Sequence, residues 1–441
     1  MPTHFRSYNP HQDLLLPPNL KEWLPEGHLS YFIDEVVDKL DIEAFYTPYQ
    51  GDGRRKAPYE PRMMLKVLIY GYATGVFSSR KLAMKLEEDV AFRLLGAGNF
   101  PAHRTLRAFR QRHLEHFKDI FVQVVKIASE VGLMSLGTVA IDGTKVKANA
   151  SKHKAMSYQR MQQKEAALKQ QIADLCTQAG STDTHEDTLY GEDRRGDELP
   201  DELQHAQARM EKIAAAKARL EAAQKQHDEA KGRHANDQRK PPKGGGPYKR
   251  DFGVPDDKAQ SNFTDPDSRI MKTSNGFDQC FNGQLAVDAD YQLIAENSLG
   301  ANGTDNNELL PMVKGVEANS GEKPQTVLAD AGYKSEANLA GLEGQQIEGY
   351  VSLGRQDKEP QAIDSEKYPA TQRMAERLSE AQGQERYAER KWIVEAVNGW
   401  IKRVLGFRQF SVRGLSAAQG EWDLVCLALN LRRMNPLMVF E

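Results

Sequence analysis

Cysteine is scarce in this 441-residue sequence. Its three cysteines, Cys176, Cys280 and Cys426, lie far apart. This spacing offers neither a disulfide framework nor a thiolate metal site, so it favours a reducing compartment, the cytoplasm. The sequence has no run of about 18 apolar residues, and residues 1–18 lack the basic-then-apolar pattern of a signal peptide. We therefore expect a protein without a membrane partner.

Acidic residues do not dominate, although the formal net charge is -3. Acids concentrate in residues 183–202, whereas basic residues concentrate before and after that segment. An overall charge near zero therefore does not exclude a nucleic-acid partner. The hydrophobic and charged fractions, 39% and 27%, are typical of a globular protein, and the length suffices for two or three domains.

Acids are absent from residues 396–414, which directly follow Glu395. The same stretch contains four basic residues, namely Lys402, Arg403, Arg408 and Arg413. Apolar residues at 393, 397, 401 and 404 predict a helix, on which Glu395 and Lys402 share a face because they are seven apart. A single carboxylate beside a basic run suits a site where a metal meets a polyanion. An ordinary solvated helix is the alternative.

The first 135 residues predict only helices, and one of them is strongly basic. In 101–117, Arg104, Arg107 and Arg110 follow one another at i, i+3 spacing, with no acid before Glu115. Short helices that end in a basic one resemble a helix-turn-helix, whose last helix contacts DNA. We expect 1–135 to be a helical DNA-binding domain; a basic surface helix in a bundle is the alternative.

Two short apolar runs each end at an aspartate that a glycine follows closely. Residues 139–141 lead to Asp142, and residues 326–328 lead to Asp330. Both patterns predict a buried strand that ends on a carboxylate, which is costly to bury without a partner. A turn-forming aspartate is the alternative.

Residues 152–260 interrupt this α/β pattern as a helical insertion and a basic linker. Two seven-residue rows, Met161–Leu168–Leu175 and Ala206–Ile213–Leu220, predict two helices joined by an acidic loop at 180–202. The helices could form a coiled-coil hairpin or an ordinary amphipathic pair, and they could fold back or dimerise. Residues 237–250 predict a flexible basic linker.

The remaining segments predict an α/β core. We expect a strand pair at 284–288 and 292–297, a helix over 304–321 capped by Thr304 or Asp305, a strand at 347–353, a polar loop before residue 390 and a helix over 415–434. Asp265 and Asp267 are predicted to be turn and cap residues, with an approach to a site as the alternative.

Three carboxylates thus converge if the two strands share one sheet edge, where sites form in α/β proteins. Like charges brought together favour a divalent cation. Oxygen-only ligands select Mg²⁺ or Mn²⁺, and two such ions can support phosphoryl displacement. The absence of a His/Cys cluster argues against zinc. The residues therefore point to nucleotidyl transfer on DNA.

The sequence also resembles a known family, the DDE-type insertion-sequence transposases, in particular the IS-eleven-eighty-two-like group related to the IS-four and IS-five superfamily. The segments that carry the resemblance are 58–98 and 100–113 in the helical region, 139–151 and 328–335 around the two aspartates, 263–272 and 282–294 between them, and 390–415 around Glu395.

The resemblance implies an RNase H-like catalytic domain over 136–441 and identifies the catalytic and metal-binding residues as Asp142, Asp330 and Glu395. Lys402 corresponds to the base of the family's Glu-x6-Lys pattern. The family often has Tyr-x2-Arg-x3-Glu ahead of it. Here Tyr387 and Arg390 lie one place too early, and Lys391 occupies the arginine position.

The expected activity is cleavage at the ends of an insertion sequence and strand transfer into target DNA. Two Mg²⁺ (or Mn²⁺) ions would activate water and then the freed 3′-hydroxyl. The expected DNA contacts are Arg104, Arg107, Arg110, Lys402, Arg403 and Arg413. We expect a nucleoid-associated homodimer or larger assembly on terminal repeats and target DNA, without a small-molecule cofactor. A nuclease that does not join DNA and a silent DNA-binding regulator are the alternatives.

Overall fold

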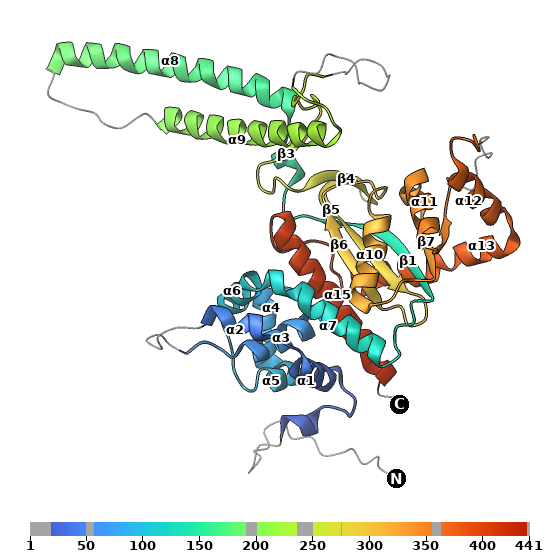
Figure 1. Ribbon diagram of the computed structural model, residues 1–441. Coiled ribbons are helices and arrows are strands. Elements are labelled where there is room, and N and C mark those ends of the chain that lie inside the picture. The colour runs from blue at the N-terminus through green and yellow to red at the C-terminus, as the bar shows by residue number, and fades with distance from the viewer. Residues whose placement is uncertain are drawn as a thin grey trace, which may run out of the picture.

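The computed structural model describes residues 19–49, 57–190, 201–235, 250–274, 276–354 and 363–438. It combines a helical N-terminal region with a sheet core, as the sequence predicts (Figure 1). Within these ranges, no helix is long and apolar enough to cross a membrane.

The N-terminal region consists of short helices. They are a 3-10 turn Leu20–Trp23, α1 (Leu29–Lys39), α2 (Glu43–Tyr46), α3 (Pro61–Ala73), α4 (Ser79–Glu88), α5 (Val90–Leu95), α6 (His103–Arg112) and α7 (Phe117–Glu130). Helix α3 lies at their centre and is buried over almost its whole length. Pro61 supplies its first turn, and Glu60 caps it by accepting a bond from Met63 N at 2.6 Å.

The sheet places three parallel strands beside an antiparallel group. Its main path is β4 (Arg269–Thr273), β5 (Gly276–Asp288), β1 (Thr138–Lys147), β7 (Thr326–Ala329) and β8 (Glu348–Val351). Strand β6 (Ile294–Gly300) also pairs with β5, which confirms the predicted strand pair. Strands β7 and β8 run parallel to β1, whereas β5 runs antiparallel to it.

Strand β1 does not end at Asp142, contrary to the prediction. It continues to Lys147 because β5 pairs with it over its whole length, from Val139 to Lys147. Only the parallel pairing with β7 stops before Asp142, at Ile141. The apolar run therefore marked the end of a strand pairing rather than the end of the strand.

Helices cover the sheet and extend from it (Figure 1). They are α10 (Leu309–Ser320), α11 (Glu336–Gly344), α12 (Pro369–Ser379), α13 (Ala381–Ala388), α14 (Arg390–Gly399) and α15 (Leu415–Met438). The prediction of a polar loop before residue 390 is therefore partly wrong, since this segment contains α12 and α13. Pro369 starts α12, and Ala370 and Met374 bury one face of it.

A π-helical turn, Trp400–Val404, follows α14. It changes the predicted apolar stripe: Ile393, Val397 and Ile401 are buried, but Val404 is 55% exposed and Leu405 is buried in its place. A π-turn takes more residues than an α-turn, so the buried position moves one residue onward. Such turns are frequent at functional sites.

The insertion forms a hairpin that projects from the sheet (Figure 1). Helices α8 (Tyr158–Tyr190) and α9 (Asp201–Ala230) pack against each other, and β2 (Ala155–Ser157) pairs with β3 (Gln260–Asn262) at its base. Members of both predicted rows are buried between the helices, namely Met161, Leu168, Ala206 and Ile213. The predicted acidic loop is shorter than expected because α8 extends to Tyr190; residues 191–200 and 236–249, with most of the basic linker, lie outside the described residues.

Helix α15 joins the two halves of the protein. It packs against α3 and α7 on one side and against β6 on the other, so the N-terminal helices and the sheet share one hydrophobic core. Its start is capped from the β3–β4 connection: Asp265 accepts a bond from Gly414 N at 3.2 Å, and Asp267 accepts one from Leu415 N at 2.9 Å. The prediction that these two aspartates are turn and cap residues is confirmed.

A buried polar network fixes α15 to the N-terminal helices. Arg110 donates to Tyr72 Oη at 2.9 Å and to Phe77 O at 2.8 Å, and Tyr72 donates to Glu421 at 2.6 Å. Glu421 also accepts bonds from the backbone and hydroxyl of Ser411, at 2.7 and 2.6 Å. Arg110 is 5% exposed and Glu421 is fully buried. Loss of the guanidinium would leave a buried carboxylate without its charge partner.

We therefore expect Arg110→Met to reduce the free energy of unfolding by about 3–5 kcal/mol, the usual effect of breaking a buried ion pair. Urea denaturation measures this change. Arg107→Ala, on the exposed face of the same helix, is the control and should change stability by less than about 0.5 kcal/mol. Equal effects of the two variants would contradict the structural role of Arg110.

Candidate active site

Two of the candidate acids lie side by side at the sheet edge. The parallel ladder between β1 and β7 ends at the pair Ile141 and Ala329, and the next residues along the two chains are Asp142 and Asp330. Neighbouring strands are about 5 Å apart. The two aspartates therefore occupy equivalent positions on adjacent strands.

The third acid reaches this edge from α14, which packs on β1 and β5. Arg390, at the start of α14, links Glu395 to Asp142. The Arg390 Nη2 atom lies 2.9 Å from Glu395 Oε1, and the Nη1 atom lies 3.7 Å from Asp142 Oδ1. Asn398, one turn beyond Glu395, donates to Asp142 Oδ2 at 3.1 Å. One helix thus supplies a carboxylate, a guanidinium and an amide to the edge of β1.

Arg390 enters the site although the sequence pattern assigned the arginine position to Lys391. The Arg390 side chain is 13% exposed, whereas Lys391 is exposed. Helix α13 ends at Ala388 and α14 starts at Arg390. Arg390, Lys391 and Glu395 all lie in α14, where the Lys391 side chain is exposed and Arg390 reaches Glu395, so counting back four residues from Glu395 selects the wrong residue.

The arrangement shifts the pKa of Asp142. Its pKa is raised to about 6, chiefly by burial; the Arg390 guanidinium opposes this shift, and the nearby carboxylates of Asp330 and Glu395 add to it. The carboxylates are thus close enough to repel one another. A cation placed among them would relieve this repulsion.

The donor set fits a hard divalent cation, because it consists of carboxylate oxygens without a sulfur or imidazole ligand. In the described part of the chain, no three acidic, histidine or cysteine side chains lie close enough to hold an ion as they stand. Arg390 lies between Asp142 and Glu395 and supplies the positive charge there. Asp142, Asp330 and Glu395 are the residues that could hold a metal once this guanidinium moves.

Asp305 is a fourth acid close to this edge, and the sequence assigned it only to a helix cap. Helix α10 begins later, at Leu309, and Asp305 Oδ1 instead accepts bonds from Asn282 Nδ2 and Gln284 Nε2, each at 2.6 Å. Both amides come from β5, where they are buried. Polar residues inside a buried strand were the signal that could have revealed this contact.

The basic residues beyond Glu395 differ in exposure. Lys402 lies in the π-turn, where burial lowers its pKa and Asp142 is close enough to oppose that shift. Arg403 and Arg413 are exposed, and Arg413 Nε donates to Asn149 O at 3.1 Å. Lys402 is therefore a predicted base that the structure places close enough to Asp142 for their charges to interact.

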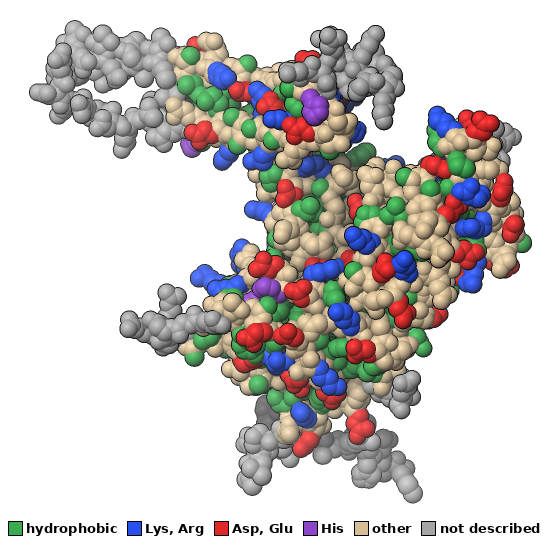
Figure 2. Space-filling model, in the orientation of Figure 1, with side chains coloured by type: hydrophobic (Ala, Val, Ile, Leu, Met, Phe, Trp, Pro, Cys, Tyr) green, Lys and Arg blue, Asp and Glu red, His purple; other side chains and the backbone are tan. Residues whose placement is uncertain are grey.

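The arginines of α6 divide into two kinds. Arg104 and Arg107 are exposed, whereas Arg110 lies in the buried network with Glu421. The predicted DNA contact by Arg110 is therefore corrected, because its guanidinium is used inside the protein. Figure 2 shows basic and acidic side chains interspersed over the face in view, so surface charge alone does not mark a DNA path there.

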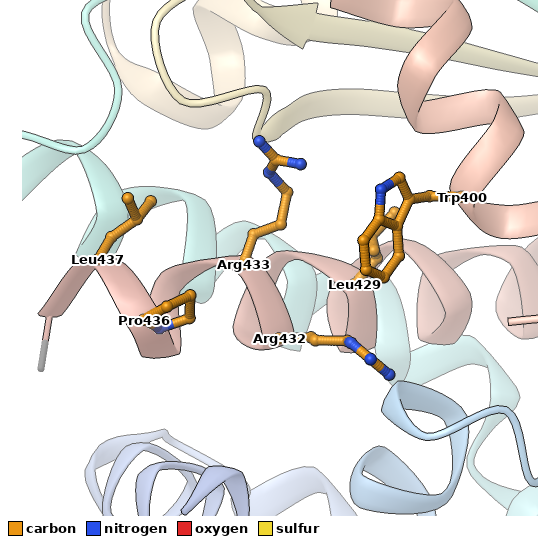
Figure 3. A pocket seen from close by; sticks show the side chains of 6 residues that line it. All are labelled: Trp400, Leu429, Arg432, Arg433, Pro436 and Leu437. Atoms are coloured by element: carbon orange, nitrogen blue, oxygen red, sulfur yellow. The ribbon is translucent and has the colours of Figure 1, made fainter. Parts of the chain in front are cut away.

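A pocket of about 320 Å³ lies between the π-turn and the end of α15 (Figure 3). Arg432 lies over the Trp400 ring at 5.2 Å and donates to Ala73 O at 2.6 Å, while Arg433 donates to Tyr291 O at 2.9 Å. None of the candidate acids lines it. The two arginines hold α15 against the N-terminal helices and the β5–β6 turn, so this pocket is separate from the carboxylates.

Asp142 should make stability depend on pH. Its pKa of about 6 exceeds the ordinary 3.8, so the folded protein holds this proton more tightly than the unfolded chain. The resulting stabilisation is complete below pH 3.8 and is lost as pH rises through 6. Asp142→Asn should therefore be more stable than wild type at pH 7.5, by about 3 kcal/mol, and this gain should shrink toward pH 4.5.

Urea unfolding in EDTA at both pH values measures the difference, with Asp119→Asn on the exposed surface of α7 as the control. An Asp142→Asn variant no more stable than wild type at pH 7.5 would refute the electrostatic account.

Comparison with known proteins gave two matches to family models. Residues 252–431 match the Transposase DDE domain, and residues 18–112 match the Transposase domain (DUF772). The first match includes Asp330 and Glu395, and the second spans α1 to α6; β1 and the hairpin lie between them. No curated protein and no solved structure gave a match. The chain thus contains two regions similar to transposase domains, and together they support an insertion-sequence DDE transposase.

Proposed function

We propose that this transposase cuts DNA at the ends of its insertion sequence and joins the freed 3′ ends to target DNA, on an RNase H-like core over 136–441. The observation that carries the proposal is the placement of Asp142 and Asp330 at equivalent ends of one parallel ladder, with Glu395 joined to Asp142 through Arg390. This placement supports a shared role for the three acids in one site.

In this proposal Asp142, Asp330 and Glu395 hold divalent cations, Mg²⁺ or Mn²⁺. When bound, such ions supply Lewis-acid activation of the attacking oxygen and stabilise the leaving one. Asn398 orients Asp142 through its 3.1 Å bond. Lys402, half-buried near Asp142, meets the phosphate backbone where it enters the site.

In this proposal Arg390 holds the site when no cation is bound. Its guanidinium balances two carboxylates that would otherwise repel each other in a partly buried place. The oxygens of Asp142 and Glu395 that Arg390 contacts are the ones that would hold a divalent cation. The Arg390 guanidinium would then pair with a DNA phosphate close to the site.

DNA would contact both regions of the protein. Arg104 and Arg107 on α6 are exposed and have no ion-pair partner among the described residues, so they are available to phosphates of the terminal repeats. Arg403 and Arg413 lie exposed beyond the Glu395 helix and would follow the same DNA toward the acids. A homodimer or larger assembly would bring two DNA ends together.

The decisive test is a cleavage and joining assay with the DNA that flanks the gene, in Mg²⁺. Glu395→Gln should lower both reactions by at least about 10³-fold, because groups that act as one unit fail together. Glu389→Gln, at the cap of the same helix, is the matched control and should retain activity.

The other outcomes assign other functions. Cleavage without joining of a pre-cut end would indicate a nuclease. Binding to the ends without cleavage by wild type, unchanged by alanine at Asp142 and Asp330, would indicate a regulator. Cleavage retained in Glu395→Gln would remove Glu395 from the site.

DNA binding by α6 gives a separate test. Arg104→Ala and Arg107→Ala should each weaken binding to the element's ends and lower the salt dependence of log K by about 1, because each removes one phosphate contact. Filter binding at several salt concentrations measures the slope. Lys126→Ala, exposed on α7, is the control; slopes equal to that of the control would exclude α6 as the DNA surface.

A further inference from the structure

Asp305 occupies a defined position between the two aspartate motifs. It lies in the connection between β6 and α10, where Oδ1 accepts bonds from Asn282 and Gln284 and lies 3.7 Å from Lys145 Nζ. Two amide donors and a lysine ammonium therefore surround one oxygen of this carboxylate. These contacts fix the Asp305 side chain and leave its second oxygen, Oδ2, pointing away from the two amides.

The space around Asp305 shows where the other oxygen points. A Cβ at Gly332 would lie 3.2 Å from Asp305 Oδ2 and 2.9 Å from Asp330 Oδ1, so both carboxylates approach the same glycine. A Cβ at Gly143, the residue after Asp142, would lie 2.5 Å from Asp305 Oδ1. The glycines of both aspartate motifs thus make room for Asp305.

Hydrogen bonds couple Asp305 to the second aspartate motif. The hydroxyl of Tyr333, three residues after Asp330, donates to Gln284 Oε1, and this bond orients the amide nitrogen of Gln284 toward Asp305. Asn338 donates to Asn306 O and to Tyr333 O, both at 2.7 Å. The loop that carries Asp305 and the loop that carries Asp330 are therefore held as one unit.

Two acceptor atoms remain unused in this unit. Asn282 is 1% exposed, and its Oδ1 has no partner. In the described ranges, no donor bonds to Asp305 Oδ2 either. Asp305 Oδ2 approaches the same glycine as Asp330 Oδ1, and the Asn282 amide that donates to Asp305 keeps a buried oxygen without a partner. Both acceptors are suited to the water shell of a hard cation, since Mg²⁺ usually retains several waters in proteins.

We propose that Asp305 is a fourth carboxylate of the active site: a positioning residue that holds the hydration shell of the divalent cation beside Asp330. This inference rests on the proposed function, because it assumes that a cation binds there. Asp305 acts through water and through the Gln284–Tyr333 contact, and it need not touch DNA.

A Mn²⁺ titration of the full-length protein without DNA, followed by the electron paramagnetic resonance signal of free Mn²⁺, tests the inference without an activity readout. Asp305→Asn should weaken Mn²⁺ binding about 10- to 100-fold, as loss of an outer-shell partner does. Its melting temperature without metal should not fall, because the amide still accepts from Asn282 and Gln284. Asp119→Asn is the control and should bind as wild type.

Asp330→Asn separates the two proposals. If Asp330→Asn binds Mn²⁺ as wild type does, the metal site of the proposed function is wrong. If Asp330→Asn loses binding and Asp305→Asn retains it, only the inference about Asp305 is overturned. A lower melting temperature of Asp305→Asn with unchanged Mn²⁺ affinity would make Asp305 merely structural and would also overturn it.

A second measurement needs no variant. Fe²⁺ in place of Mg²⁺, with ascorbate and peroxide, generates hydroxyl radicals that cut the backbone close to the bound ion. Wild-type protein should be cut near residues 305 and 330, and excess Mg²⁺ should suppress both cuts. A cut near 330 without one near 305 would contradict the inference.

Discussion

The site depends on the repulsion between carboxylates that the fold brings to one sheet edge. Asp142 and Asp330 are adjacent because their strands pair in parallel up to the preceding residues, and α14 brings Glu395 to the same place. Burial at this edge raises the pKa of Asp142, and the neighbouring carboxylates of Asp330 and Glu395 add to the shift. In the structure the Arg390 guanidinium offsets the negative charge of Asp142 and Glu395. In the proposed function, divalent cations would offset the charge of all three acids when DNA is cut.

The rest of the fold holds this edge in place. Helix α15 packs on both the sheet and the N-terminal helices, and the network of Arg110, Tyr72 and Glu421 joins them through buried charge. The arginines exposed on α6 are therefore attached through one continuous core to the edge that carries the acids. A DNA end held by α6 could thus be presented to the acids without a flexible joint between the two parts.

The sequence predicted the elements whose signals are local. Apolar runs before Asp142 and Asp330 predicted the paired strands, and seven-residue rows predicted two helices, which the structure pairs as the α8–α9 hairpin. It could not predict effects of distant packing. Arg110 looked like a surface base because α15, which covers it, follows about 300 residues later in the chain. Asp305 looked like a helix cap because its actual partners, Asn282 and Gln284, lie on β5, more than 20 residues earlier in the sequence.

The central claim is that Asp142, Asp330 and Glu395 form one cation site from which Arg390 is displaced. Anomalous scattering from crystals grown with Mn²⁺ and a DNA end tests it most directly. The account predicts anomalous peaks with oxygens of all three acids about 2.0–2.2 Å away, and an Arg390 guanidinium that no longer bridges Asp142 and Glu395. Peaks elsewhere, or peaks without Glu395 while Arg390 keeps both contacts, would contradict it.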